Sequence, residues 1–353
     1  MTNNIKFESV ISLNSLLKIF FVILFLYVGQ SLLIPLFYGL FIAIILYPLS
    51  KKLESSGINK LISISISLAI LGLLFCILIG ILLYEFNSFR KDIPLLKEKI
   101  IPLVQSMNEW LLATFGILIS KSTLSFSNIF KLAGSDIGSL IKMTINNIFG
   151  TFFYLTIIPI YAALILFYRK TLVSFLRVLS GEKHREQLER ILTKTIQSYN
   201  QYIKGMLLVY VVVGILNSLG LLMLGVKYAI FFGMLTAFMT MIPYIGIIIS
   251  SLLPLSISYI STNSIFYPLG VLGIFSIVQY LEANFIFPMI VGKQLNINIL
   301  VSIVGVFAGG MLWGVSGMIL IFPLLAVTKI ISDEILEWEP IRILISVPDH
   351  GSR

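Results

Sequence analysis

The chain has 353 residues, of which 58% are hydrophobic and only 12% are charged, and its mean hydropathy is +1.01. A soluble chain of this length would carry about 25% charged residues, so the composition excludes a water-soluble globule and indicates an integral membrane protein. The formal charge of +9 does not indicate a nucleic-acid partner, because the basic residues flank the apolar runs, as the positive-inside rule expects. The single cysteine, Cys76, lies within an apolar run, which excludes disulfides and thiolate metal sites.

The N-terminal part of the chain contains three predicted spans. Residues 1–15 are polar and no cleavage site follows them, so the first run, 16–33, is predicted to be an uncleaved span. The second span, 35–50, is predicted to form a hairpin with the first, pinched at Ile34 and Pro35. A third span is predicted over 61–85.

Five further spans follow in the rest of the chain, and their predicted ranges are 147–168, 205–225, 228–260, 265–287 and 299–328. No charged residue or histidine lies between Lys227 and Glu282, or between Lys293 and Lys329. Because a spanning helix needs about 20 apolar residues, the first gap has room for two spans and the second for at least one. The sequence predicts an all-α polytopic membrane protein, one domain over 1–353, with about eight transmembrane helices, some interrupted, plus amphipathic helices.

Basic residues predict the orientation of the chain in the membrane. Lys51, Lys52 and Lys60 mark the loop after the second span as cytoplasmic. The segment 169–204 carries more basic than acidic residues and is predicted to be a cytoplasmic amphipathic helix segment. With eight spans, both termini are then cytoplasmic and 86–146 is an extracytoplasmic segment. That segment also has a basic excess, but the rule is weak for long loops.

Two segments outside the spans are predicted to be amphipathic helices. In 92–114 and again in 185–203, apolar or aromatic residues recur at three- and four-residue spacing beside charged ones. Each helix could lie in the membrane interface or pack on neighbouring spans.

The sixth span carries Pro243 and Gly246 at its centre, in the stretch MTMIPYIGIIIS, and both residue types disfavour a helix interior. Proline lacks an N–H donor, and glycine permits backbone angles that are closed to other residues. Backbone groups freed inside a bilayer survive only within protein or beside a water-filled cavity. The stretch therefore predicts either a break that exposes carbonyls to a cation or a hydroxyl-rich solute, or a simple proline kink.

The eighth span contains AGGMLWGVSGMILIFP, in which four glycines precede a proline: Gly309, Gly310, Gly314, Gly317 and Pro323. Small residues at this spacing allow close helix packing, and the same glycines would let the segment turn back as two half-helices. Two interrupted spans in one chain indicate a transport site.

The stretch IVQYLEANFIFPMIVGK places an ionisable residue, Glu282, in the seventh span. Gln279, three residues earlier, lies on the same helix face, whereas Asn284 points the other way. Burying a charge in a bilayer is costly, so Glu282 is a functional candidate that could alternate between protonated and cation-bound states. The alternative is an interfacial glutamate that is capped by water or paired with Lys293.

Enzyme signatures are absent from the sequence: it contains no G-x-x-x-x-G-K-[ST], no H-E-x-x-H and no G-x-S-x-G. Its two histidines, His184 and His350, lie in a charged segment and in the C-terminal tail. We therefore expect no enzyme activity, no catalytic residues, no metal and no cofactor. Transport without a nucleotide motif is passive or driven by an ion gradient.

Three stretches resemble the autoinducer-2 exporter family of bacterial permeases: IPYIG at 242–246, the run from Gln279 through Glu282 to Gly292, and GGMLWGVSGMILIFPLLAV at 309–327. The resemblance covers mainly 147–332. It implies eight spans with cytoplasmic termini, a large segment between the third and fourth spans, and a homo-oligomeric assembly of five copies. Some members of that family export the quorum-sensing signal autoinducer-2, whereas others resemble sodium–proton antiporters, so the resemblance leaves both substrates open.

We therefore expect a secondary transporter of the bacterial inner membrane that exports a small polar solute such as autoinducer-2. A Na⁺/H⁺ antiporter is the alternative within transport, and a non-transporting membrane scaffold is the alternative from another class. The expected partners are membrane lipid, a small-molecule or cation substrate and further copies of the chain, and not nucleic acid. The residues expected to line the substrate or ion pathway are Pro243, Tyr244, Gly246, Gln279, Glu282, Asn284, Pro288, Gly292, Lys293, Gly309, Gly310 and Gly314.

Overall fold

The computed structural model describes residues 13–91, 98, 148–243, 245–291 and 297–347. Within these residues the chain is helical, apart from turns and one isolated bridge between Ile297 and Ser346. The predicted all-α class is confirmed. The predicted helix at 92–114 falls, apart from one residue, outside the described part of the chain.

The first two helices, α1 (Leu13–Val28) and α2 (Gln30–Ser55), are separated by Gly29 alone. The pinch predicted at Ile34 and Pro35 is wrong, because both residues are buried inside α2. The helices part at Gly29, where a Cβ atom would lie 2.8 Å from a backbone carbonyl oxygen one turn earlier. Only a residue without a side chain fits this close approach.

The other long apolar helices of the N-terminal half are α3 (Lys60–Arg90) and α7 (Ile148–Phe167). α7 turns by 67° into α8 (Arg169–Ser180), an amphipathic helix in which no residue is buried. At this elbow the Arg169 guanidinium forms an ion pair with Glu54 of α2. The ion pair ties the start of α8 to the end of α2.

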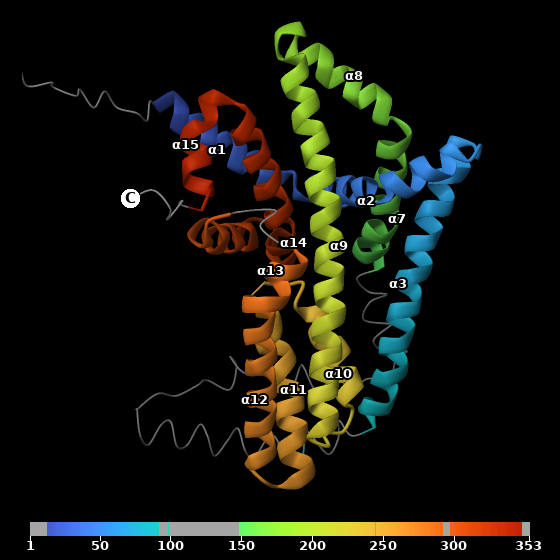
Figure 1. Ribbon diagram of the computed structural model, residues 1–353, viewed down its shortest axis with the longest axis vertical. Coiled ribbons are helices and arrows are strands. Elements are labelled where there is room, and N and C mark those ends of the chain that lie inside the picture. Colours follow the sequence, from blue (N-terminus) through green and yellow to red (C-terminus); the bar gives the residue numbers. More distant parts are fainter. Residues whose placement is uncertain (1–12, 92–97, 99–147, 244, 292–296, 348–353) are drawn as a thin grey trace, which may run out of the picture.

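A three-residue helical turn leads into α9 (Arg185–Met223), a continuous helix of 39 residues that runs most of the length of the molecule (Figure 1). At 1.5 Å per residue it is about 58 Å long. It contains both the predicted amphipathic segment 185–203 and the predicted span 205–225. The two predicted segments form one helix without a break between them. Gly205, which lies at their junction, is buried within this helix and packs against Val291.

The remaining helices follow in chain order: α10 (Ala229–Met239), α11 (Ile245–Thr262), α12 (Phe266–Leu281), a π-helical segment (Glu282–Ile286), α13 (Phe287–Ile290), α14 (Ile299–Glu334) and α15 (Glu339–Ile345). Five helices of the described chain are long and apolar enough to cross a membrane, or six if α7 and α8 form one bent span. The chain is therefore a multi-pass membrane protein. The predicted count of eight is not confirmed, since α10 and α11 are too short on their own.

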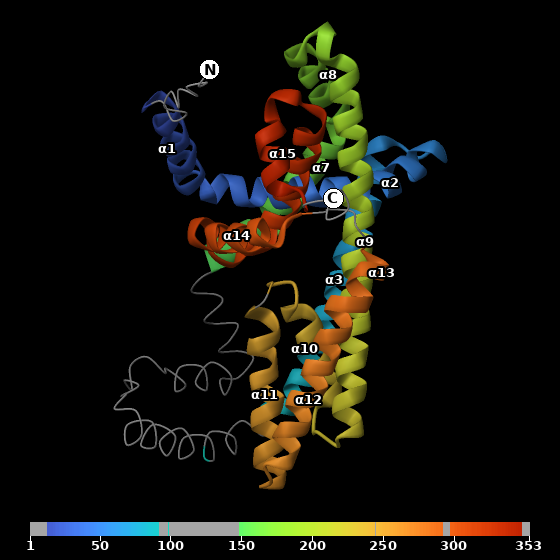
Figure 2. The same ribbon diagram turned by 60° about the vertical axis from the view of Figure 1, so that its left-hand side comes forward.

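The helices gather at two levels along α9. α10, α11 and α12 run beside the C-terminal half of α9, whereas α1, α2, α14 and α15 lie towards its other end (Figures 1 and 2). The largest apolar cluster joins α3 to α10, α11 and α12 around Phe89, Phe232 and Val271. A second cluster packs Val209 and Val213 of α9 against α12 and α13. The interrupted segments lie where the two levels meet.

Candidate transport site

The first interruption lies between α10 and α11. α10 ends at Met239, and the next residues form tight turns in which Met241 N–H donates to Phe238 O (3.3 Å) and Ile242 N–H donates to Met239 O (2.9 Å). Thr240 also donates its hydroxyl to the Thr236 carbonyl at 2.8 Å. The span therefore breaks before Pro243 into two helices, which is more than a proline kink within one helix.

Gly246 has a different role from the one predicted. It lies in the first turn of α11, its φ is not positive, and it is buried. A Cβ atom at this position would lie only 1.8 Å from the Met239 carbonyl oxygen. Gly246 is thus required because the start of α11 passes directly against the end of α10, and not because it adopts unusual backbone angles.

The second interruption divides α14 into two arms. Trp313 and Gly314 leave the helical conformation, and Gly314 has a φ of +59°, which glycine adopts at little cost. Across the turn, a Cβ at Gly309 would lie 2.6 Å from the Gly317 oxygen, and one at Gly317 would lie 1.9 Å from the Gly309 oxygen. The glycines therefore do both things that the sequence suggests: they let the segment turn back, and they let its two arms pack closely.

The tip of this helical hairpin is fixed to the N-terminal helices. The Trp313 indole Nε1–H donates to the Leu26 carbonyl of α1 at 2.9 Å, and its ring lies 5.7 Å from the ring of Phe37 of α2. Gly310, in the first arm, faces Met318 of the second arm. The hairpin is thus held at its turn as well as along its arms.

Glu282 lies at the start of the π-helical segment that follows α12. It is 9% exposed, and its Oε2 atom is buried without a hydrogen-bond partner in the described part of the chain. Tyr210 of α9 lies within electrostatic range of this carboxyl group. π-helical turns inside α-helices occur often at functional sites, and a buried acid without a partner needs an ion, a water or a proton.

The neighbours of Glu282 differ in exposure. Gln279 is half-buried, whereas Asn284 is exposed and donates its side-chain amide to the Tyr280 carbonyl at 2.9 Å. Pro288 is exposed in α13. Three further residues named from the sequence lie outside the described residues: Tyr244, Gly292 and Lys293. An ion pair between Glu282 and Lys293 is therefore not described.

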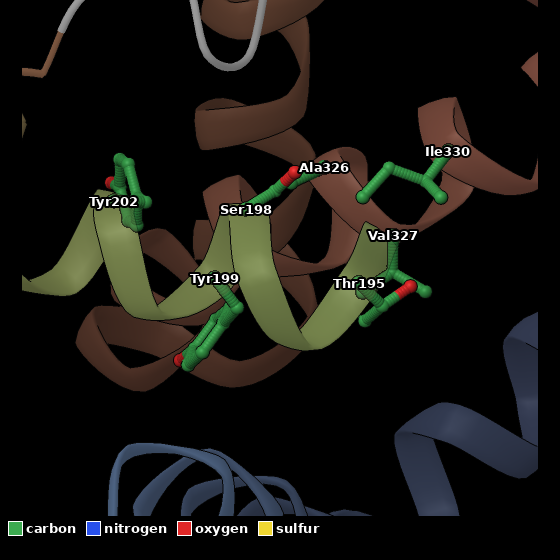
Figure 3. Close-up of a pocket in the computed structure, with 7 residues that line it drawn as sticks. All are labelled: Thr195, Ser198, Tyr199, Tyr202, Ala326, Val327 and Ile330. Carbon is green, nitrogen blue, oxygen red and sulfur yellow. The ribbon is translucent and has the colours of Figure 1, made fainter. Parts of the chain in front are cut away.

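The sequence did not predict a recess between α9 and the second arm of α14. The α9 wall carries hydroxyl groups and the α14 wall is aliphatic (Figure 3), and the lining residues are Thr195, Ser198, Tyr199, Tyr202, Ala326, Val327 and Ile330. The recess has no internal space for a water molecule. In the sequence, only the three- and four-residue spacing of Thr195, Tyr199 and Tyr202 indicates that these residues share a helix face. The segment that packs on this face, residues 326–330 of α14, lies more than 100 residues further along the chain, so the recess could not be predicted.

α9 is the element that connects these features. The π-helical segment and α13 pack on it, α10 packs along it, and the hairpin of α14 packs on it and on α2. Both views place α13 and the turn between α10 and α11 near the middle of its length (Figures 1 and 2). Among the described residues, no group of three or more His, Cys, Asp or Glu side chains is placed to hold a metal ion.

A multi-pass membrane protein that is helical in its described part, with two broken spans and a buried carboxyl oxygen that has no hydrogen-bond partner among the described residues, has the architecture of a membrane transporter. The model of the AI-2E transporter family matches residues 16–337, and the chain belongs to that family. It is similar to the AI-2 transport protein TqsA of Escherichia coli, with 24% identity over 324 residues that cover 90% of each chain. It is also similar to YueF of Bacillus subtilis, named a "Putative transport protein", with 26% identity over 89% of this chain and 90% of the relative.

Proposed function

We propose that the protein is a secondary transporter that exports a small polar solute across the bacterial inner membrane, driven by an ion gradient. The observation that carries the proposal is the buried carboxyl group of Glu282 in the π-helical segment between α12 and α13, whose Oε2 atom has no hydrogen-bond partner among the described residues. In this account Glu282 alternates between a protonated and a cation-bound state, because a permanently charged and unpaired carboxylate is costly inside a membrane.

Autoinducer-2 is the first candidate solute, because the relative TqsA is named as an AI-2 transport protein. The second candidate function is Na⁺/H⁺ antiport. The same buried carboxyl group favours it, since a carboxylate oxygen suits both a proton and a hard cation.

Flux measurements on the purified chain in proteoliposomes test the proposal. Vesicles are loaded in parallel with autoinducer-2, with sodium or with a pH-sensitive dye, and an ion gradient is imposed. Movement of autoinducer-2 that depends on the gradient supports export, and sodium-dependent proton movement without solute supports antiport. A chain that moves none of the three contradicts the proposal and favours the alternative of a non-transporting membrane scaffold.

We further propose that both termini face the cytoplasm and that the protein forms a homo-oligomer, pentameric as in the family it resembles. α3 leaves nearly all of its side chains open to lipid or to another copy, because only 6% of the residues in its most apolar 18-residue stretch are buried. Native mass spectrometry of the detergent-extracted protein measures the copy number. A measured mass equal to that of a single chain would contradict the proposed homo-oligomer.

Cysteine labelling tests the proposed orientation. In a Cys76→Ala background, Glu186→Cys should react with a membrane-impermeant thiol reagent only from the cytoplasmic side, because it lies in the basic segment 169–204. Asn108→Cys should react only from the outside of intact cells. Labelling of both positions from outside contradicts this orientation and the eight-span topology from which it was predicted.

A further inference from the structure

The recess between α9 and α14 joins two chemically different walls. Thr195, Ser198, Tyr199 and Tyr202 give the α9 wall four hydroxyl-bearing side chains, and the α14 wall is purely aliphatic (Figure 3). The Thr195 Oγ1 atom is buried and has no hydrogen-bond partner in the described part of the chain. Buried polar groups normally have a hydrogen-bond partner. The closed recess leaves the Thr195 hydroxyl group without one, whereas in an open recess water or a solute could bind it.

A cluster around Glu334 holds the recess closed at one end. Arg190 Nε donates to Glu334 Oε2 at 3.0 Å, Lys194 Nζ donates to Oε1, and the Gln187 side-chain amide donates to the Glu334 carbonyl oxygen. Glu334 is the last residue of α14 and lies one turn beyond Ile330. Its side chain is only 10% exposed, and each of its two carboxylate oxygens binds a basic residue of α9.

The outer end of α14 has a point at which it can bend. Leu320, in the inner part of the second arm, is buried against α2 and against Tyr199. Pro323 follows and lacks the N–H donor that would tie the next turn to the one before. The part of α14 that lines the recess, from Ala326 onwards, lies beyond this proline. A bend at Pro323 would move this outer part while Leu320 stays packed.

We propose that this recess is the closed mouth of the transport path and that Glu334, with Arg190 and Lys194, is the lock that keeps it shut. When the outer end of α14 leaves α9, the Thr195 and Ser198 hydroxyl groups become hydrogen-bonding partners for a neutral solute rich in hydroxyl groups. Tyr199 stays stacked on Phe41 of α2, and Tyr202 stays in the apolar cluster of α9, α12 and α13. The aliphatic wall then packs against the carbon skeleton of that solute. The assignment of a solute path rests on the proposed transport function, whereas the lock does not.

Thiol accessibility tests the lock without any transport assay. In a Cys76→Ser background, Ser198→Cys reports whether a water-soluble thiol reagent can enter the recess in proteoliposomes. Adding Glu334→Gln removes the charge that Arg190 and Lys194 bind, so the labelling rate should rise about five- to ten-fold. The rise is moderate because both partners are 55% exposed and screened by solvent. Asp333→Asn is the matched control, since Asp333 pairs with Lys329 within α14 and should leave the rate unchanged.

An unchanged labelling rate in Glu334→Gln overturns the lock, and so does an equal rise in Asp333→Asn. If Glu334→Gln loses its monodisperse elution profile, Lys194→Gln breaks the cluster from the exposed side and should raise the rate in the same direction. An unchanged rate in that folded variant also overturns the lock.

Cross-linking tests whether the recess lies on the path. Ser198→Cys with Val327→Cys places one thiol on each wall, and a short reducible cross-linker should stop solute flux until it is reduced. Thr193→Cys with Gln197→Cys is the control, because both residues are exposed on α9 and their cross-link stays within one helix. Full flux through the cross-linked recess overturns the proposed mouth. A parent protein that transports no probe instead contradicts the transport function, while the labelling rates still decide on the lock.

Discussion

Replacing Glu282 with glutamine is expected to abolish ion-gradient-driven flux while the protein still folds. Glutamine keeps the size and the hydrogen-bonding capacity of the side chain but cannot bind and release a proton or bind a cation as a carboxylate does. Oε2 of Glu282 is buried and has no hydrogen-bond partner among the described residues, and Glu282 is the one titratable residue of the π-helical segment Glu282–Ile286. Flux in proteoliposomes should fall to the level of protein-free vesicles.

The matched control is Glu337→Gln, which removes an exposed acid near the C-terminal end. It should transport at the parental rate. If Glu282→Gln also retains full gradient-driven flux, Glu282 is an interfacial residue without a role in coupling, and the site must be sought elsewhere.

The second large effect is expected at Gly246. Helix propensity alone predicts that alanine stabilises a helical glycine position by about 0.5–1 kcal/mol. The structure reverses the sign, because the new Cβ would lie 1.8 Å from the Met239 carbonyl oxygen, a backbone atom that cannot rotate away. Gly246→Ala should therefore lower the free energy of unfolding by about 1–3 kcal/mol and reduce flux, because α11 must move away from α10.

Gly273→Ala separates this contact from the general effect of adding a methyl group. Gly273 lies in α12, and a Cβ there would meet no atom within 4 Å, so alanine should be neutral or stabilising. Denaturant unfolding in detergent micelles measures both variants. Equal stability and flux in Gly246→Ala and the parent would show that the close contact between α10 and α11 has no role.

Local chemistry explains which parts of the fold were predictable. The long apolar runs gave the helical membrane class, because bilayers accept only backbone that satisfies its own hydrogen bonds. The breaks near Pro243 and Gly314 were also predictable, since one residue lacks a donor and the other accepts a positive φ. Both are properties of single residues in an apolar run.

Features that depend on distant segments were not predictable. The first two helices meet at Gly29 and not at Pro35, where the sequence predicted the bend. The position of the bend depends on the close contact between Gly29 and a backbone carbonyl, and not on the donor that proline lacks. Nothing in the run EANFI signals that it forms a π-helical turn. The pairing of Glu334 with Lys194 joins residues 140 positions apart, and such pairing is fixed only when α9 and α14 pack together.

The proposed transport cycle depends on one step, in which Glu282 exchanges a proton for a cation or for a solute-coupled ion. Infrared difference spectroscopy on the reconstituted protein observes this step directly, because a protonated carboxyl group absorbs at a different frequency from a carboxylate. Adding the coupling ion to the parent should remove a carboxylic-acid band, and the band should be missing from Glu282→Gln throughout. A parent spectrum without this change, or the same change in Glu282→Gln, would contradict the account.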